Sequence, residues 1–418
     1  MAKKKTKMSE QARIQIEQAR YRKMYFEKLQ YFCDTYGGKG TYALIPPNYL
    51  KGLFMFRIRP FKIETDTSST IDAKTHKYIH KLLFHTMHCM SIKIDDHLPN
   101  IELDDYFIYG HAIKALSYNE KDTPDKLWIA ELMKRLELLV HSDVLDRAID
   151  EVFKLMLNVG TMLSHMQNHI VWLTCEFKSG DSGCLQNIAH LHIQKPAIKR
   201  FLLPDGSRLG YRVSWYIQSE GIQEYSIKSS QWEPSSTFAD LPIAVYVQSH
   251  ALQRLWERID VYAPHLVQIN MLISLINPII IRTGKNNGLL EYSINGNKYG
   301  YLVCEFIDGD ILIKTFLFLT NNGTPEGKKL NELTGLGKYD KKYLAIDRIS
   351  SFIASDIEHN ETLKKLFIQS GCESLVYAAE HLNFEKEKFS QYESSSLIAE
   401  YIKKEPVPIL EEEFVCFS

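Results

Sequence analysis

Two short turns near residue 300 constrain the fold of this chain more than any other feature. Asn295-Gly296 and Asp308-Gly309 are each flanked by alternating apolar residues. Dipeptides of this kind favour two-residue hairpin turns, in which both central residues need a positive φ. Together with the segments IIIRT, LLEYSI, YGYLVCEFI and DILIKTFLFLT, they predict a four-stranded antiparallel meander over residues 279–320.

Two helices are predicted directly before this meander. The first lies in the segment YVQSHALQRLWER (residues 246–258), and the second covers residues 264–276. His250, Arg254 and Arg258 recur at steps of four, which places them on one face of the first helix. The other side carries apolar residues, namely Ala251, Leu252, Leu255 and Ile259. This helix is therefore expected to have a buried side and a cationic side.

The length of the chain predicts more than one domain. A chain of 418 residues exceeds what one compact core usually holds. We predict an α+β protein in three parts. A polar, proline-bearing linker at residues 229–242 separates the first part from the second. Residues 1–230 form a mixed helical and antiparallel β region, residues 243–350 form the two helices and the meander, and residues 351–418 form a helical tail.

Within the N-terminal part, the pattern changes from helical to strand-like and back. A helical period covers residues 9–36 and ends at Gly37-Gly38, and large apolar and cationic residues then alternate over residues 42–66, which predicts strands. Helices follow at residues 122–140 and 142–166. From Ile170 onward, short β-branched and aromatic segments predict an antiparallel meander.

One face of this N-terminal meander is predicted to be basic. Its exposed positions include His190, His192, Lys195, Lys199, Arg200, Arg208 and Arg212. The aromatic residues Tyr211, Trp215 and Tyr216 lie between them. Such a face can hold single-stranded nucleic acid by stacking and phosphate contacts, but ordinary cross-strand pairs explain the same aromatic residues.

Histidines cluster in residues 75–94. His76 and His80 are one helical turn apart, as are His85 and Cys89, and His165 and His169 form a third such pair. This spacing can chelate a metal, and Asp95, Asp96, Asp104 and Asp105 could add oxygen ligands. Histidines of an amphipathic helix are more commonly packed or solvated. We therefore assign no metal and no cofactor, and leave metal binding by residues 76–89 open.

Composition limits the partners and the compartment. The 50 basic and 51 acidic residues give a net charge of −1, so nucleic acid can only be attracted by a local patch. Seven dispersed cysteines without a CxxC pair are typical of reduced thiols. No apolar run reaches the roughly 20 residues that cross a bilayer, and the basic N-terminus lacks the apolar part of a signal peptide. We expect a cytoplasmic protein with no membrane contact.

Common catalytic motifs do not occur in the sequence. There is no Walker loop, GxSxG elbow, HExxH pair or Rossmann glycine run. Phosphoryl transfer, serine hydrolysis, zincin chemistry and dehydrogenase chemistry are therefore disfavoured.

The unit of two helices and a meander resembles a known enzyme family. HALQRLWER, a helix that ends in NPI, and strands with a polar residue at the end of the last one are similar to the α+β endoribonucleases related to RelE toxins, barnase, EndoU and colicin RNases. The resemblance covers residues 246–329. It implies metal-independent cleavage of RNA, in which the ribose 2′-OH attacks the adjacent phosphate. Ile259, where a glycine turn is expected, and a long insertion after Thr320 depart from the family pattern.

This chemistry needs a base, a cation for the developing phosphorane charge and an acid. His250 is the expected base or acid, because its unperturbed pKa lies near neutrality. Arg254 and Arg258 would hold the phosphate. Lys314 and Thr320 are six positions apart, an even step, so strand alternation places them on one face and turns Thr315 toward the core.

Aromatic and basic residues outside this set are candidates for binding RNA. Tyr299 and Tyr301 share a face of one strand and could stack on a base. Lys338 and Tyr339 belong to a basic, aromatic segment that could contact an RNA strand.

Two functions of different classes remain. The first is a toxin-like or defence-related cytoplasmic endoribonuclease, whose N-terminal half recognises the substrate or restrains the enzyme, with RNA and an inhibitory protein as partners. The second is a non-catalytic structural or interaction protein, in which the cationic face is merely solvated and Glu257 pairs with Arg254. Convergence of His250, Arg254 and Lys314 or Thr320 on one phosphate-sized position would favour the enzyme, and side chains that point apart would argue against it.

Overall fold

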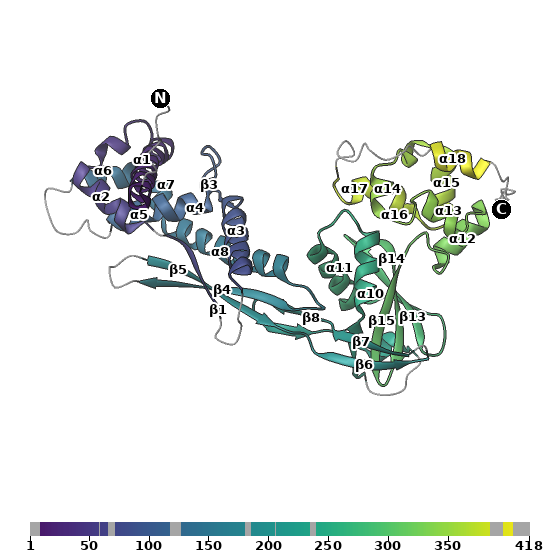
Figure 1. The fold of residues 1–418 in the computed structure, drawn as a ribbon. Helices are drawn as coiled ribbons and strands as arrows, with labels where there is room; N and C mark the ends of the chain where they lie inside the picture. The colour runs from purple at the N-terminus through teal and green to yellow at the C-terminus, as the bar shows by residue number, and fades with distance from the viewer. Residues whose placement is uncertain are drawn as a thin grey trace, which may run out of the picture. The chain divides into compact units, whose positions relative to one another are not determined.

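The structure is a computed structural model that describes residues 9–57, 59–65, 72–117, 127–179, 185–204, 206–234, 240–384 and 396–403. Contacts divide the chain into two compact units. Unit 1 comprises Met1–Met162 and Val171–Ile193, and unit 2 comprises Leu163–Ile170 and Gln194–Ser418. Both contain helices and sheets, which confirms the α+β class (Figure 1). The predicted domain ranges 1–230, 243–350 and 351–418 stay a prediction. The two units do not test them, because each unit consists of two separate segments of the chain.

Unit 1 begins with a long helix whose ends follow its sequence. Helix α1 (Glu10–Gly37) starts after Ser9, whose hydroxyl accepts the N–H of Ala12 at 3.3 Å, and it stops at Gly38, which has a φ of 85°. Residues 42–66 were predicted as strands. This is confirmed only for β1 (Arg59–Thr65), because the chain before it forms the turn η1 (Tyr42–Leu44) and helix α2 (Pro47–Phe56). Pro47 suits the first turn of a helix, where its missing N–H costs nothing.

Unit 1 also contains further helices and a small sheet. They are α3 (Ala73–His88), α4 (Leu103–Asp105), the π-helical turn η2 (Tyr106–Gly110), α5 (His111–Ser117), α6 (Leu127–Arg135), α7 (Glu137–Val140) and α8 (Ser142–Leu163). The sheet has the order β1-β5-β4, from Arg59–Thr65, Leu185–Gln194 and Ile170–Ser179, and β1 pairs with β5 in parallel. Strands β2 (Ser91–Ile92) and β3 (Ile101–Glu102) form a separate pair.

Unit 2 is built on a sheet of eight strands. Its main order is β12-β13-β14-β15-β11-β7-β6, and β10 also pairs with β11. The bounds are β6 (Ile198–Leu203), β7 (Gly206–Arg212), β10 (Ser226–Lys228), β11 (Pro242–Val247), β12 (Ile280–Arg282), β13 (Asn287–Ile294), β14 (Asn297–Ile307) and β15 (Asp310–Phe318). A separate pair is formed by β8 (Ser214–Ile217) and β9 (Gly221–Glu224). Helix α9 (Ser229–Trp232) precedes β11.

The predicted four-stranded meander is present as β12 to β15. These strands pair antiparallel in chain order. Both turns have the expected backbone, with φ of 51° and 79° at Asn295-Gly296 and 50° and 84° at Asp308-Gly309. The meander predicted for the N-terminal part is not a single sheet. Strand β5 pairs with β1 and β4, whereas β6 and β7 extend the sheet of unit 2 through β11.

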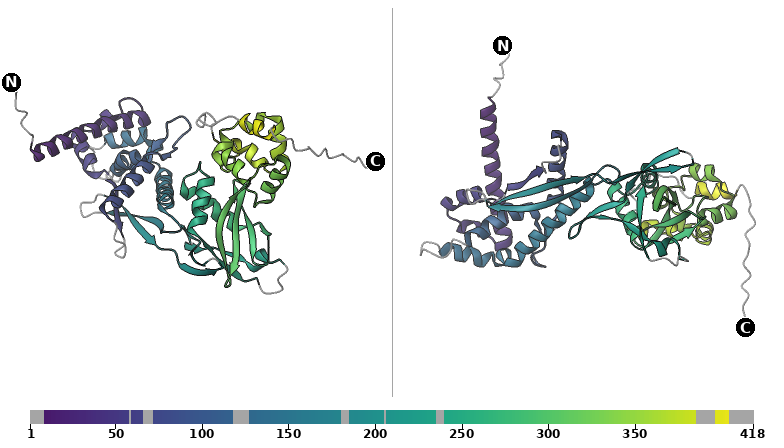
Figure 2. Two further views of the ribbon diagram at one scale, coloured as in Figure 1. Left: turned by 45° about the vertical axis from the view of Figure 1, so that its right-hand side comes forward. Right: turned by 90° about the horizontal axis from the view of Figure 1, so that it is seen from below.

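Helices cover one face of this sheet, and further helices lie at one end of it (Figure 2). Helix α10 (Ser249–Arg258) packs on β15, and α11 (Pro264–Ile276) packs on β13. The predicted apolar side of α10 is buried, with Ala251, Leu252, Leu255 and Ile259 at most 1% exposed. Helices follow β15 from residue 325 onward, earlier than the predicted tail of residues 351–418, and all of them are called the tail below. They are α12 (Pro325–Thr334), α13 (Lys338–Tyr343), α14 (Ile349–Ile353), η4 (Ile357–His359), α15 (Glu361–Gln369), α16 (Glu373–Val376), α17 (Ala378–His381) and α18 (Ser396–Lys403).

Among the described residues, no helix combines the length and the apolar character that crossing a membrane requires. The cytoplasmic location stays a prediction.

Candidate functional site

A cleft of about 660 Å³ lies in unit 2 beside the start of helix α10. Its walls come from three parts of the chain. Strands β6 and β7 with their connection contribute Leu203, Arg208, Leu209 and Tyr211, the start of α10 contributes Gln248, Ser249 and His250, and β15 contributes Lys314 and Thr315. Two predicted site residues, His250 and Lys314, therefore line the same cleft.

Parallel strand pairing brings His250 and Lys314 together. Val247, the last residue of β11, pairs with Ile313 of β15, and the N–H of Gln248 donates to the carbonyl of Ile313 at 3.0 Å. The residue that follows Ile313 therefore lies beside the first turn of α10. Because β11 and β15 run in the same direction, this arrangement follows from the register of the two strands.

A β-bulge in strand β15 turns Lys314 and Thr315 toward the cleft. Cys304 pairs with Ile313 and Val303 pairs with Thr315, which leaves Lys314 as an extra residue on β15. Both side chains are half-buried and line the cleft. The prediction that Thr315 faces the core is therefore wrong, because an extra residue breaks the simple alternation of sides.

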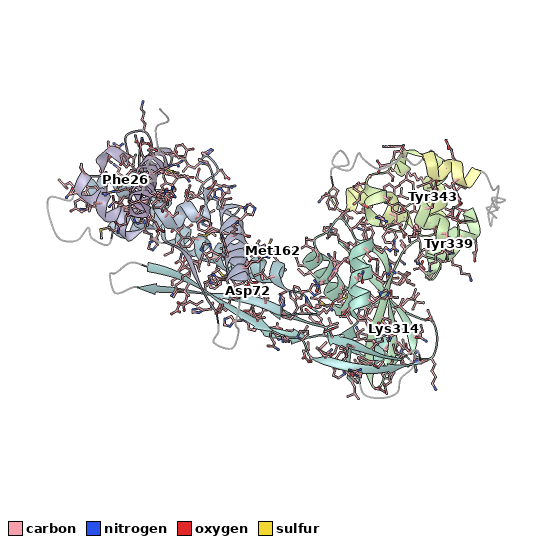
Figure 3. All side chains as sticks on the ribbon, viewed as in Figure 1. Phe26, Asp72, Met162, Lys314, Tyr339 and Tyr343 are labelled. Carbon is pink, nitrogen blue, oxygen red and sulfur yellow. The ribbon has the colours of Figure 1, made fainter. Side chains whose placement is uncertain are left out.

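The cleft contains cationic and titratable groups. His250 is exposed, whereas the Lys314 ammonium contacts the carboxylate of Glu305 at 2.7 Å (Figure 3 labels Lys314). Arg208 is exposed at the wall formed by β7. The N-cap residue of α10 is Gln248, whose side chain makes no capping hydrogen bond. The N–H groups of an uncapped helix start attract anions, which adds to the cationic character of the cleft.

Arg254 and Arg258 lie on α10 but do not line the cleft. Arg254 forms an ion pair with Glu257 at 2.8 Å, the pairing considered as an alternative from the sequence. The guanidinium of Arg258 bonds to the carboxylate of Asp347 and donates to its carbonyl at 3.3 Å. Both guanidinium groups have anionic partners, as the Lys314 ammonium does, and they differ from Lys314 in lying outside the cleft. The expected convergence is therefore found for His250 and Lys314 but not for Arg254.

Thr320, Tyr299 and Tyr301 are fully buried. Thr320 follows the end of β15, and its hydroxyl donates to the carbonyl of Ile346 at 2.6 Å. The Tyr301 hydroxyl donates to Glu326 at 2.9 Å, and burial raises the pKa of Tyr301 to about 12. These side chains are covered by the core of unit 2, so they are not positioned to touch a nucleotide in the cleft.

Lys338 and Tyr339 are exposed on helix α13 of the tail. Figure 3 places Tyr339 and Tyr343 in the tail, away from Lys314 in the sheet. They belong to a surface separate from the cleft.

Sequence reasoning did not connect Arg208 and Tyr211 with His250. It placed them on a basic N-terminal sheet, and only the pairing of β7 with β11 brings them to α10. The alternation of basic and aromatic residues in β7 was the available signal. Its partner strand could not be read from that segment alone.

Comparison of the chain with protein-family models, with curated proteins and with solved structures gives no match.

Proposed function

We propose that unit 2 is a metal-independent endoribonuclease whose active site is the cleft beside α10. The observation that carries this proposal is the meeting of His250, Lys314 and Arg208 in one cleft with Tyr211. The group contains a titratable imidazole, two cations and an aromatic ring. A toxin-like or defence-related role in the cytoplasm belongs to the same proposal.

In the proposed reaction, His250 accepts the proton of the ribose 2′-OH as that oxygen attacks phosphorus. The phosphorus–oxygen bond to the 5′ oxygen of the next nucleotide then breaks. Arg208, Lys314 and the start of α10 offset the added negative charge on the phosphorane. Either the Lys314 ammonium or the Tyr211 hydroxyl donates a proton to the leaving oxygen. The expected products carry a 2′,3′-cyclic phosphate and a 5′-hydroxyl.

Recognition of RNA is expected to be local. With a net charge of −1, the chain has no global attraction for a polyanion, so the cleft itself must supply it. Tyr211 offers a ring for a base, while Leu203 and Leu209 offer apolar contact.

The test is cleavage of a fluorescent single-stranded RNA in excess chelator by the wild type and two variants of helix α10. His250→Ala should lower the rate by about 10²-fold or more, because it removes the proposed base. Arg254→Ala is the matched control, since Arg254 lies one turn further along α10, outside the cleft. It should retain activity within about threefold, because the exposed ion pair of Arg254 with Glu257 contributes little to stability.

A second measurement separates catalysis from binding. An RNA with 2′-O-methyl groups cannot undergo the reaction, and its binding is followed by fluorescence anisotropy. If the protein binds the 2′-O-methyl RNA but does not cleave unmodified RNA, the enzyme hypothesis is rejected in favour of the non-catalytic interaction protein. Equal rates for the wild type and His250→Ala would show that the activity arises elsewhere, and absence of both cleavage and binding would reject the cleft as an RNA site.

A further inference from the structure

We propose that unit 1 binds a divalent transition-metal ion through His88, Glu102 and Asp104. Each of the three side chains offers one ligand atom, and these atoms lie within 4.8 Å of one another. The site is separate from the cleft of unit 2 and does not depend on the proposed ribonuclease activity. It also differs from the helical pairs His76/His80 and His85/Cys89 that the sequence suggested.

The local fold brings the three residues together. His88 is the last residue of α3, and the chain continues directly into β2. Strand β2 pairs with β3 so that Ser91 lies opposite Glu102, and the N–H of Leu103 donates to the carbonyl of Met90 at 2.9 Å. These backbone bonds hold the end of β3 and the start of α4 against the end of α3.

The distances between the groups suit a shared cation. Nδ1 of His88 lies 3.1 Å from a carboxylate oxygen of Glu102 and 3.4 Å from one of Asp104. Ligand atoms bound to one metal at about 2.0–2.2 Å are separated by roughly 3–3.5 Å, which follows from tetrahedral or octahedral angles. The backbone N–H of Asp105 donates to the other oxygen of Asp104 at 3.0 Å, which orients that carboxylate.

Negative charge accumulates around this group. Asp105 follows Asp104 directly and adds a third carboxyl group. Lys28 contacts Asp105 at 3.7 Å, and the end of α3 adds the partial negative charge of a helix C-terminus. A bound divalent cation would offset this charge.

The donor set indicates the class of metal. One imidazole nitrogen with two carboxylate oxygens suits Zn²⁺, Mn²⁺ or Co²⁺ better than Ca²⁺ or Mg²⁺, which prefer oxygen ligands alone. His88 and Glu102 are partly exposed, so water can complete the coordination. The main competing explanation is a protonated His88 that forms ion pairs with the two carboxylates.

Equilibrium dialysis of the full chain against Zn²⁺ tests the proposal, and the visible spectrum of added Co²⁺ provides a second readout. The wild type should bind one tight equivalent. His88→Ala and Asp104→Asn should each weaken this binding at least about tenfold, because loss of a ligand costs no less than loss of an outer-shell partner. His85→Ala is the matched control, since His85 is exposed one turn earlier on α3, and it should bind as the wild type does.

Three results would overturn the proposal. The first is no Zn²⁺ binding by the wild type, which would leave the ion pairs as the explanation. The second is equal affinity of His88→Ala and the wild type. The third is an equal loss of Zn²⁺ affinity in His85→Ala, which would move the metal to another part of α3.

Folding of the variants is checked separately. The circular dichroism spectrum of each variant without metal must match that of the wild type. Zn²⁺ should then raise the thermal midpoint of the wild type but not that of a correctly folded His88→Ala.

Discussion

At the scale of single residues, the site depends on which charged groups line the cleft. Arg254 and Arg258 share a helix face with His250, as their spacing predicts, but Glu257 and Asp347 pair with them. The spacing of cations along a helix is visible in the sequence. The anions that meet them, particularly one far along the chain such as Asp347, are not.

The pairing of Lys314 with Glu305 leads to a first prediction. In Glu305→Gln, the ammonium loses its anionic partner and the cleft loses a nearby negative charge. We expect RNA to bind about three- to tenfold more tightly, which corresponds to a change of about 1 kcal/mol in a partly exposed ion pair. Fluorescence anisotropy with 2′-O-methyl RNA measures this affinity. Lys314→Ala should weaken binding, and tighter binding by Lys314→Ala would remove the lysine from the proposed site.

A second prediction concerns the buried lysine of the helical tail. Lys341 is 2% exposed, and its ammonium donates to the carbonyl of Gly327 at 2.8 Å and to the side-chain oxygen of Asn322. Burial lowers the pKa of Lys341 from 10.5 to about 8. The unfolded chain therefore binds more protons than the folded chain between these values, and the contribution of Lys341 to the free energy of unfolding increases as pH rises through this window.

Denaturant unfolding of the wild type and Lys341→Met at pH 8 and pH 9.5 measures this effect. The free energy of unfolding of the wild type relative to the variant should increase by about 1–2 kcal/mol over this interval. Cysteines and tyrosines that titrate in both proteins cancel in the difference, except Cys372, whose pKa is raised by burial and lowered in part by Lys341 itself. A constant difference between the two proteins would show that Lys341 keeps the same pKa on unfolding.

At the scale of elements, Gly300 allows strands β14 and β15 to approach closely. A Cβ at this position would lie 2.3 Å from the carbonyl oxygen of Leu317 and 2.5 Å from the ring of Phe316. Gly300→Ala should lower the free energy of unfolding of unit 2 by about 3 kcal/mol, because a backbone atom must move. Urea unfolding followed by tryptophan fluorescence measures the loss.

Gly284→Ala is the control for Gly300→Ala. Gly284 is exposed, and the nearest atom to its added Cβ is a side-chain atom of Asn287 at 3.6 Å. Its effect should stay within about 0.5 kcal/mol, as for most surface substitutions. Equal effects of the two variants would contradict the close approach at Gly300.

The elements that could be predicted are those whose signals are local. Ser9 and Gly38 mark the ends of α1, and the two Asx-Gly turns fix the meander. What escaped prediction depends on long-range pairing. The bulge at Lys314 and the pairing of β7 with β11 have no signature in either segment, and half of the cleft depends on them.

At the scale of the whole molecule, the two units share the chain in an interleaved order. The segment Leu163–Ile170 belongs to unit 2 although residues of unit 1 precede and follow it. Met166 and Ile170 are at most 1% exposed in the core of unit 2, and the N–H of Met166 donates to the side chain of Gln268 at 2.8 Å. Unit 2 is therefore incomplete when it begins at residue 194.

Two fragments test this interleaving. In the first, residues 171–193 of the 163–418 segment are replaced by a short Gly-Ser linker, and the second begins at residue 194. The second should be less stable by about 3–6 kcal/mol, because two large apolar side chains are no longer buried. Thermal and urea unfolding compare them. Equal stability of the two fragments would show that Leu163–Ile170 adds nothing to unit 2.

The interleaved order also has a consequence during translation. As the nascent chain leaves the ribosome, Leu163–Ile170 emerges before the last piece of unit 1 and before nearly all of unit 2. Its apolar residues Met166 and Ile170 can be buried only after α11 and the sheet of unit 2 have been synthesised. Unit 1 can complete its own fold first, and a chaperone that shields short apolar segments would act at this step.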